Sequence, residues 1–175
     1  MRKTSQFSIF GNNYRTHQFA AARGVEMLCE GSASANPVAL LSGTEVLATE
    51  GWLELSGIGA INALVKDSLG LAASLVVLDA LCAKVYEENF GFLASWKPVA
   101  IPKRFVSTID FKIEEYKIDP VISTVVMAGQ ATIRELEEYY STEDAFKMYD
   151  MIAVDNLNKA LGSEAAMADA KARGR

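Results

Sequence analysis

Three helix starts follow one another between residues 119 and 161, and this arrangement constrains the fold more than any other feature of the chain. Asp119 suits an N-cap and Pro120 the first helical position, where the N–H that proline lacks would have no partner. Gly129 suits the end of that first helix, because glycine readily adopts the left-handed conformation of a C-cap. The sequence therefore predicts three helices, over residues 120–128, 133–139 and 142–161.

The second and third of these helices begin with capping sequences. Thr132 and Glu135 have the spacing of a capping box, in which each side chain pairs with the other residue's backbone N–H. Ser141 repeats this pattern, with Glu143 and Asp144 in the first helical turn, where the helix dipole favours negative charge.

Acidic side chains gather in two stretches of the sequence. Residues 134–155 contain seven Asp or Glu against two basic residues, and no Lys or Arg occurs between Arg23 and Lys66. These stretches are either solvated acidic surface or contact faces for a basic partner. The candidate partner-contact residues are Glu26, Glu30, Glu45, Glu50, Glu54, Glu135, Glu137, Glu138, Glu143 and Asp144.

The composition narrows the possible partners. A net charge of −5 argues against nucleic acid, since such binding depends on neutralising phosphates. The longest uncharged apolar run, residues 68–78, is about half as long as a membrane-spanning helix, and the N-terminus lacks the apolar core of a signal peptide. We therefore expect no nucleic acid or membrane partner, and a cytosolic protein with enough apolar residues for a folded core.

The residues that usually carry catalysis or bind metals are scarce. His17 is the only histidine, and Cys29 and Cys82 both lie among apolar neighbours that predict reduced thiols in the core. Neither glycine-rich phosphate-binding pattern is present. The sequence therefore predicts a protein that is not an enzyme and has no catalytic residue, cofactor or bound metal.

The N-terminal half is predicted to be a small hairpin followed by helices. Alternating polarity over residues 4–19 indicates two strands joined at Gly11-Asn12-Asn13, and residues 20–30 form a helix that ends at Gly31. Short helices packed at angles fit residues 32–59 best, and a further helix covers residues 57–66.

A central core helix is expected over residues 69–88, capped by Asp67 or Ser68. Apolar residues recur there at steps of three and four, which predicts one buried face. This face consists of Leu71, Leu75, Leu78, Cys82 and Val85.

The predicted fold class is mainly α, with a small N-terminal β-hairpin packed on a helical core and a C-terminal three-helix module. We divide the chain into a hairpin with helical core (1–96), a linker (97–118), the tandem-helix module (119–161) and a charged tail (162–175). Residues 105–118 are expected to include a strand or a short helix, and the tail to continue the last helix weakly before fraying.

Two parts of the chain resemble the tail assembly chaperones of tailed bacteriophages. The first is the strand–turn–strand–helix opening, Phe7–Tyr14 with Gln18–Leu28. The second contains Asp119-Pro120-Val121, Glu135-Leu136-Glu137, the helix start Tyr140–Ala145 and Ile152–Asn156. The resemblance implies a non-enzymatic helical protein that binds the tape measure protein and helps recruit tail tube subunits in the host cytoplasm, with self-association possible.

The same resemblance leaves a second interpretation open. The protein would then be a structural subunit of the tail or baseplate and would remain in the virion tail. The chemistry of the interface distinguishes the two interpretations. An assembly factor must release its partner, whereas a permanent subunit needs a stable apolar contact.

Overall fold

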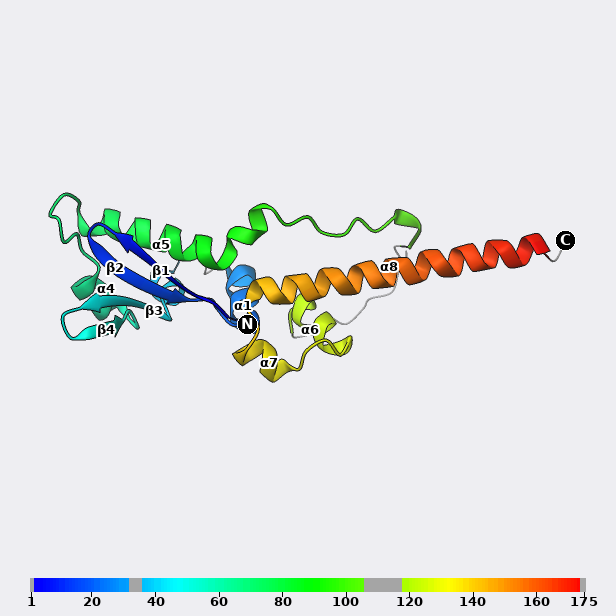
Figure 1. Cartoon of the computed structure of the whole chain (residues 1–175), viewed down its shortest axis with the longest axis horizontal. Helices are drawn as coiled ribbons and strands as arrows, with labels where there is room; N and C mark the ends of the chain where they lie inside the picture. The colour runs from blue at the N-terminus through cyan, green and yellow to red at the C-terminus, as the bar shows by residue number, and fades with distance from the viewer. Residues whose placement is uncertain (1, 32–35, 106–117, 174–175) are drawn as a thin grey trace.

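A four-stranded antiparallel sheet forms one end of the elongated molecule, in the order β1-β2-β3-β4 (Figure 1). The computed structural model describes residues 2–31, 36–105 and 118–173. The predicted hairpin is present as β1 (Thr4–Ile9) and β2 (Asn12–His17). Its turn lies at Phe10-Gly11, one residue earlier than predicted, and both residues have positive φ angles of 46° and 79°.

Residues 44–54 form strands, so the prediction of short helices throughout 32–59 is wrong. In the described part of this segment, α3 (Pro37–Leu40) is helical and a second helix begins at Ile58. Between them, β3 (Thr44–Ala48) and β4 (Gly51–Glu54) extend the hairpin into a sheet. Pairing with β2 decides this outcome, because it buries alternate residues, here Thr44 and Val46. The buried Thr16 and Thr44 hydroxyls also hydrogen-bond to each other at 2.9 Å.

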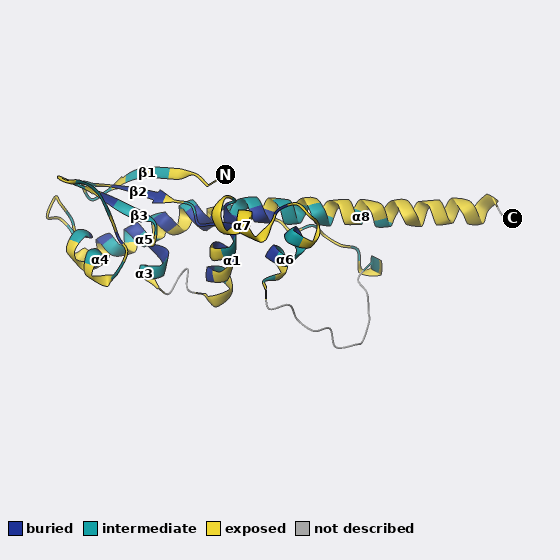
Figure 2. Cartoon of the chain, turned by 90° about the horizontal axis from the view of Figure 1, so that it is seen from below, coloured by how far each residue is buried: buried dark blue, intermediate teal, exposed yellow. Residues whose placement is uncertain are grey.

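Three helices cover one face of the sheet, namely α3, α4 (Ile58–Leu64) and α5 (Ser74–Phe90) (Figure 2). The main core between these layers contains Tyr14, Val46 and Ile61 together with one side of α5. That side consists of Val77, Leu81, Val85 and Phe90.

The predicted helix 69–88 starts too early, and its predicted buried face is right only in part. Val85 is buried and Leu78 and Cys82 pack against the core, whereas Leu71 and Leu75 are exposed. The Asp67 carboxylate accepts hydrogen bonds from the backbone N–H groups of Leu69 (2.7 Å), Leu71 and Ala72 (2.6 Å). These bonds hold a loop where the helix was expected to begin, and α5 starts only at Ser74. As a result Leu71 is 80% exposed and Leu75 is 67% exposed, whereas Leu81 is completely buried.

A second core joins α1 (Ala21–Glu30) to α6 (Pro120–Met127), α7 (Ile133–Glu138) and α8 (Thr142–Arg173). The Ala21 N–H donates to the Tyr140 carbonyl at 2.8 Å, which ties the start of α1 to the chain entering α8. Phe92, in the 3-10 helix η1 (Gly91–Ala94), and Trp96 contact Phe146 edge-on. Because α1 also contributes Met27 to the first core, it connects the N-terminal and C-terminal parts of the chain.

The three predicted C-terminal helix starts are confirmed. Asp119 accepts from the Val121 N–H at 2.7 Å, and Gly129 ends the first helix region with a φ of 71°. Thr132 and Glu135 form both bonds of the capping box. Ser141 and Asp144 make the equivalent reciprocal pair, from the Ser141 N–H to Asp144 Oδ2 at 3.0 Å and from the Asp144 N–H to Ser141 Oγ at 3.2 Å.

Replacing Thr132 or Ser141 with alanine is expected to lower the free energy of unfolding by roughly 1 kcal/mol each, because each substitution leaves a helix N–H without its capping oxygen. Urea denaturation followed by circular dichroism measures this change. Thr49→Ala, at an exposed position outside any helix, is the control and should have little effect. Unchanged midpoints for both cap variants would mean that these side chains do not stabilise their helices.

The last helix extends beyond the predicted bound of residue 161, because α8 continues as one helix of 32 residues to Arg173. The tail therefore continues this helix, as predicted. At 1.5 Å per residue such a helix is about 48 Å long. Its distal part is exposed and projects away from the rest of the molecule (Figure 2). The charged tail, as far as it is described, therefore forms the last 12 residues of this helix, 162–173.

The described part of the predicted linker runs beside α8. It includes the 3-10 helix η2 (Lys103–Phe105), whose Arg104 forms an ion pair with Glu164 at 3.1 Å. The strand or short helix expected over 105–118 lies almost entirely outside the described residues. The structure is 58% helical, so the mainly α prediction is broadly consistent with it, although the N-terminal hairpin is part of a larger sheet.

Candidate protein interaction surfaces

Most of the acidic residues predicted to contact a partner already have a partner within the chain. Glu135 and Asp144 cap α7 and α8, and they interact with backbone and hydroxyl groups. Four others form ion pairs: Glu26 with Arg23, Glu45 with Arg15, Glu138 with Arg134, and Glu143 with Lys147. Except for Glu45, these pairs link residues three or four positions apart on an exposed helix surface, where a pair contributes little to stability.

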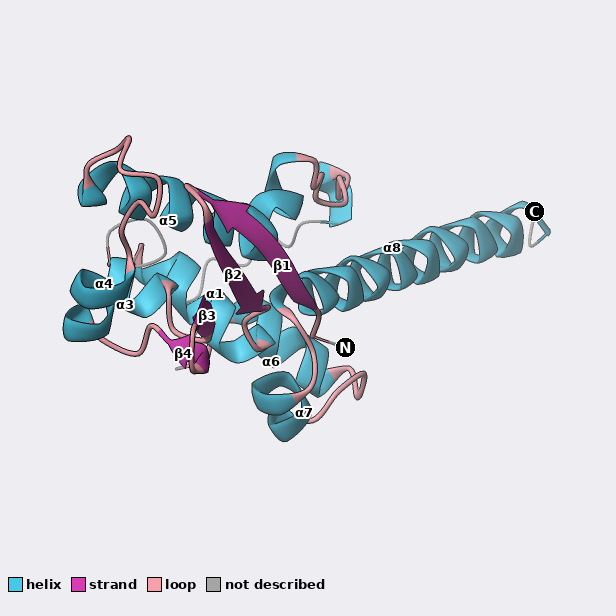
Figure 3. Ribbon diagram, turned by 60° about the vertical axis from the view of Figure 1, so that its left-hand side comes forward, coloured by secondary structure: helices cyan, strands magenta, loops and turns pink. Residues whose placement is uncertain are grey.

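The packing of α1 against α6 and α7 brings together Glu26, Glu30 and Glu137, which come from two different acidic stretches (Figure 3). They line a groove with a volume of about 600 Å³. Apolar residues from two distant parts of the sequence also line this groove, namely Ala22, Ile118, Pro120 and Ile122. We call this feature the acidic groove.

The charges around the acidic groove are mostly negative. Among the described residues that line it, Glu26, Glu30, Asp119 and Glu137 are acidic and Arg23 is basic, with its Nη1 2.6 Å from Glu26 Oε2. Glu137 has no ion pair or hydrogen bond with any other described residue. A groove with this lining suits a segment that carries both apolar and basic side chains.

Cys29 lies in the acidic groove, so the prediction that its thiol is buried in the core is wrong. Its Sγ lies 3.0 Å from Asp119 Oδ2 and donates a hydrogen bond to it. This bond raises the pKa of the Cys29 thiol, because the thiolate would face the carboxylate. The thiol therefore stays protonated and is a poor nucleophile.

Glu50 and Glu54 do not share the acidic groove. They are exposed at the β3–β4 turn and on β4, at the sheet end of the molecule (Figure 1). Neither makes an ion pair or hydrogen bond within the part of the chain that the structure describes. The first acidic stretch is therefore divided between two surfaces.

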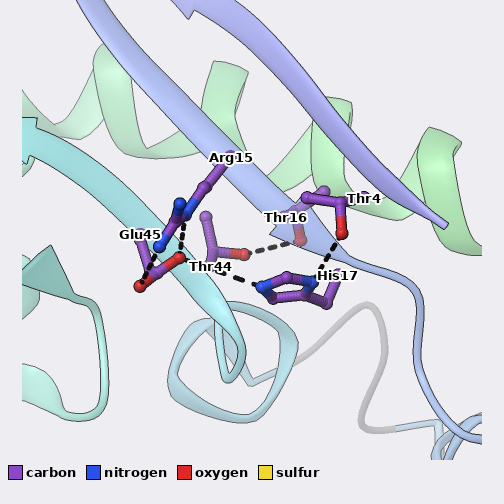
Figure 4. A network of polar contacts seen from close by, with 6 residues as sticks. All are labelled: Thr4, Arg15, Thr16, His17, Thr44 and Glu45. Carbon is purple, nitrogen blue, oxygen red and sulfur yellow. Dashed lines mark hydrogen bonds and ion pairs between the residues drawn. The ribbon is translucent and has the colours of Figure 1, made fainter. Parts of the chain in front are cut away.

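A polar network covers the outer face of the sheet (Figure 4). Two hydrogen bonds run from the Arg15 guanidinium to the Glu45 carboxylate and lower the pKa of that carboxyl. His17 lies beside it, with Nδ1 2.8 Å from Thr4 Oγ1 and Nε2 3.9 Å from Glu45 Oε2. Arg15 also stacks on the Trp52 ring at 4.6 Å.

This sheet-face network stabilises the pairing of β2 with β3, and its geometry does not activate a hydroxyl as a nucleophile. Arg15 and Glu45 are cross-strand neighbours on β2 and β3, so their pairing favours the observed register. His17 and Trp52 both have partners here. Thr4, His17 and Glu45 follow one another as hydroxyl, imidazole and carboxylate, but Arg15 holds the Glu45 carboxylate, and its Oε2 lies 3.9 Å from His17 Nε2, too far to orient the ring through a hydrogen bond. The Thr16 and Thr44 hydroxyls bond to each other on the buried face of the sheet.

An exposed apolar patch at the sheet end of the molecule was missed by the sequence reasoning. It contains Leu69, Leu71, Leu75 and Val76, all more than half exposed, and we call it the aliphatic tip. Its loop is held in place by the Asp67 bonds and by Ser68, which bonds to the Phe10 carbonyl. The signal was present as the uncharged run 68–78, which was interpreted as the start of a core helix.

Within the described residues there is no group of three or more His, Cys, Asp or Glu side chains placed to hold a metal ion. The second thiol, Cys82, is partly buried, and burial raises its pKa to about 11. In the same part of the chain, no helix combines the length and apolar character needed to cross a membrane.

Comparison of the chain with protein-family models, curated proteins and solved structures finds no match. Inferences about function therefore depend on the surfaces described above and on the resemblance of the two sequence segments. The two surfaces of greatest interest are the acidic groove and the aliphatic tip.

Proposed function

We propose that the protein is a non-enzymatic assembly chaperone of phage tails, which binds the tape measure protein in the host cytoplasm and helps recruit tail tube subunits. The observation that carries this proposal is the acidic groove, where an apolar lining is surrounded by carboxylates. It suits a helical client with basic and apolar side chains. The two segments that resemble tail assembly chaperones include α1 and α7, the helices that bring Glu26 and Glu137 to this groove.

The chemistry of the groove suits a contact that must later be released. A long helical protein waiting for its tube exposes apolar surface that favours aggregation, so it benefits from a temporary cover. Exposed charges contribute to such a contact but are screened over about 10 Å at 0.1 M salt. Binding through the groove is therefore expected to be specific, moderate in strength and sensitive to salt.

The test is co-expression with the tape measure protein of the same phage genome, followed by affinity capture at low salt and at 1 M salt. We expect wild-type protein to hold the client at low salt and to lose most of it at 1 M. Glu26→Lys combined with Glu137→Lys should weaken capture at least tenfold at low salt, because it reverses two charges in the groove.

Glu50→Lys combined with Glu54→Lys is the matched control. It changes the net charge by the same amount but lies away from the groove, so capture should remain at the wild-type level. If the control pair abolished capture and the groove pair did not, the client would bind at the sheet end. Failure of wild-type protein to capture the client in any buffer would contradict the proposed function itself.

The aliphatic tip favours the alternative, a structural subunit that remains in the tail or baseplate. Four large exposed apolar side chains, two on a loop held by hydrogen bonds and two in the first turn of α5, suit a stable apolar interface. Mass spectrometry of purified virions distinguishes the two functions. Stoichiometric protein in mature particles, with a complex that survives 1 M salt, would support the subunit, whereas absence from particles supports the chaperone.

A further inference from the structure

From Met151 to Ala172, α8 carries a coiled-coil repeat that is exposed to solvent. Its positions follow alternating steps of three and four residues over three heptads, the spacing that keeps one face of a helix against another helix. Every member is exposed, and the helix stands apart from the body along most of this length (Figure 3). The members, which we call the α8 seam, are Met151, Val154, Asn158, Leu161, Ala165, Ala168 and Ala172.

The α8 seam lies on a different side of the helix from the residues that contact the protein's own body. Successive residues of an α-helix are rotated by about 100°, so residues three or four positions apart lie on the same face. The seam residues therefore share one face, and the residues that face the body share another. Tyr149, Ile152, Asn156 and Ala160 line a hollow beneath η2 and α6, together with Phe105 and Thr124. Ala168 lies at the border between the two faces, in a hollow next to Arg104. The repeat is therefore not needed for the contacts that α8 makes within the chain.

Charged residues beside the α8 seam indicate what it can bind. Asp155 and Asp169 flank one side, and Glu164 and Lys171 flank the other. Asp155 pairs with Lys159 at 2.6 Å, and Glu164 pairs with Arg104 at 3.1 Å. Both pairs are exposed, so a partner's cations can replace Lys159 and Arg104 at little cost. Three acids against one base at these flanking positions favour a basic partner.

A second copy of the chain is a poor occupant in the parallel arrangement. In-register pairing would oppose alanine to alanine at three successive positions and would place Glu164 opposite Asp169 of the other copy. Small residues on one helix pack best against large residues on the other, and like charges across the seam are unfavourable. A parallel second copy is therefore a poor fit. An antiparallel copy would carry the same acidic flanking residues, so these favour instead a basic helix with large aliphatic residues at its core positions.

We propose that the α8 seam binds an amphipathic α-helix of another protein, with Leu or Ile at its core positions and Lys or Arg beside them. The proposal rests on the proposed function: this helix is a segment of the helical client. The acidic groove and the α8 seam then hold the client at two separate places. Both contacts are partly electrostatic, in keeping with a complex that must dissociate.

The test uses the full chain and two synthetic peptides of three heptads with leucine at the core positions. One peptide has lysine at the flanking positions and the other glutamate, and binding is measured by fluorescence anisotropy. We expect the lysine peptide to bind at least tenfold more tightly than the glutamate peptide. Val154→Asp combined with Leu161→Asp should weaken the lysine peptide at least tenfold, and because both side chains are already exposed, folding should be unaffected.

Ala166→Asp combined with Ala170→Asp is the matched control, since it adds the same charges to exposed positions of the same helix outside the seam. Its affinity for the lysine peptide should equal or exceed that of wild type. Unchanged binding by the seam variant would overturn the proposal. Seam-dependent dimerisation of the wild-type chain in sedimentation equilibrium would also overturn it, by identifying a second copy as the occupant.

The co-expression experiment separates failure of this inference from failure of the proposed function. If the seam variant captures the tape measure protein normally while the groove variant does not, the function stands and the seam proposal fails. If wild-type protein captures no tape measure protein but binds the lysine peptide through the seam, the seam stands and its client is a different helical protein.

Discussion

Replacing Gly24 with alanine is expected to lower the free energy of unfolding by about 3 kcal/mol, a large effect for adding one methyl group. An added Cβ would lie 1.8 Å from Thr142 Oγ1 and 3.0 Å from Thr142 Cβ. Neither helix can move aside easily, because the Ala21 N–H is bonded to the Tyr140 carbonyl next to this contact. Urea denaturation monitored by circular dichroism and by tryptophan fluorescence measures the change.

Two other variants show whether the effect comes from this contact. Gly162→Ala, the same substitution on the exposed part of α8 with no atom within 4 Å of the new methyl group, should stabilise the protein by roughly 0.5–1 kcal/mol. The Thr142 hydroxyl is buried and has no hydrogen-bond partner among the described residues, so Thr142→Ala should cost little by itself. Combined with Gly24→Ala, it should recover part of the lost stability.

A neutral Gly24→Ala variant would contradict the close approach of α1 and α8. Full additivity of the two substitutions would place the damage somewhere other than this contact. The approach matters for the acidic groove as well, since α1 presents Glu26 to it from the same helix. Gly24→Ala is therefore also expected to weaken client capture, although it substitutes none of the residues that line the groove.

Features determined by neighbouring residues could be predicted from the sequence. The capping sequences at Thr132 and Ser141 place helix starts correctly, because an N-cap forms within four residues of the chain. The β1–β2 hairpin could be predicted for the same reason, since its turn residues and alternating polarity are adjacent. The alanine-rich sequence after Leu161 contains no strong stop signal, so continuation of the helix into the tail could be predicted, but the residue at which it ends could not.

Features determined by distant residues could not be predicted. Residues 44–48 are short and apolar enough to be either strand or helix, and pairing with β2, some 30 residues earlier in the sequence, decides between them. The acidic groove depends on α1 meeting α7, which is more than 100 residues away in the sequence. Charge patterns marked Glu26 and Glu137 as candidates, but only the fold shows that they line the same surface.

Replacing Leu81 with alanine is expected to lower the free energy of unfolding by about 2–5 kcal/mol, whereas Leu71→Ala should change it by less than about 0.5 kcal/mol. Leu81 is completely buried between α5 and the sheet, and its loss would leave a cavity among Tyr14, Val77 and Val85. Leu71 is 80% exposed in the loop held by Asp67. Thermal and urea denaturation of the two variants under the same conditions measure the difference.

This comparison tests whether the helix starts at Ser74 or earlier. The apolar spacing in the sequence places Leu71 in the core, and the structure places Leu81 there instead, because the Asp67 carboxylate occupies the N–H groups that an earlier helix start would use. A large loss of stability for Leu71→Ala would indicate that the helix starts earlier and that Leu71 is buried. The aliphatic tip would then not be an exposed patch. If Leu71→Ala is neutral, that leucine contributes nothing to folding while remaining exposed. Its side chain would then be available for the apolar contact that distinguishes a permanent tail subunit from a chaperone that dissociates.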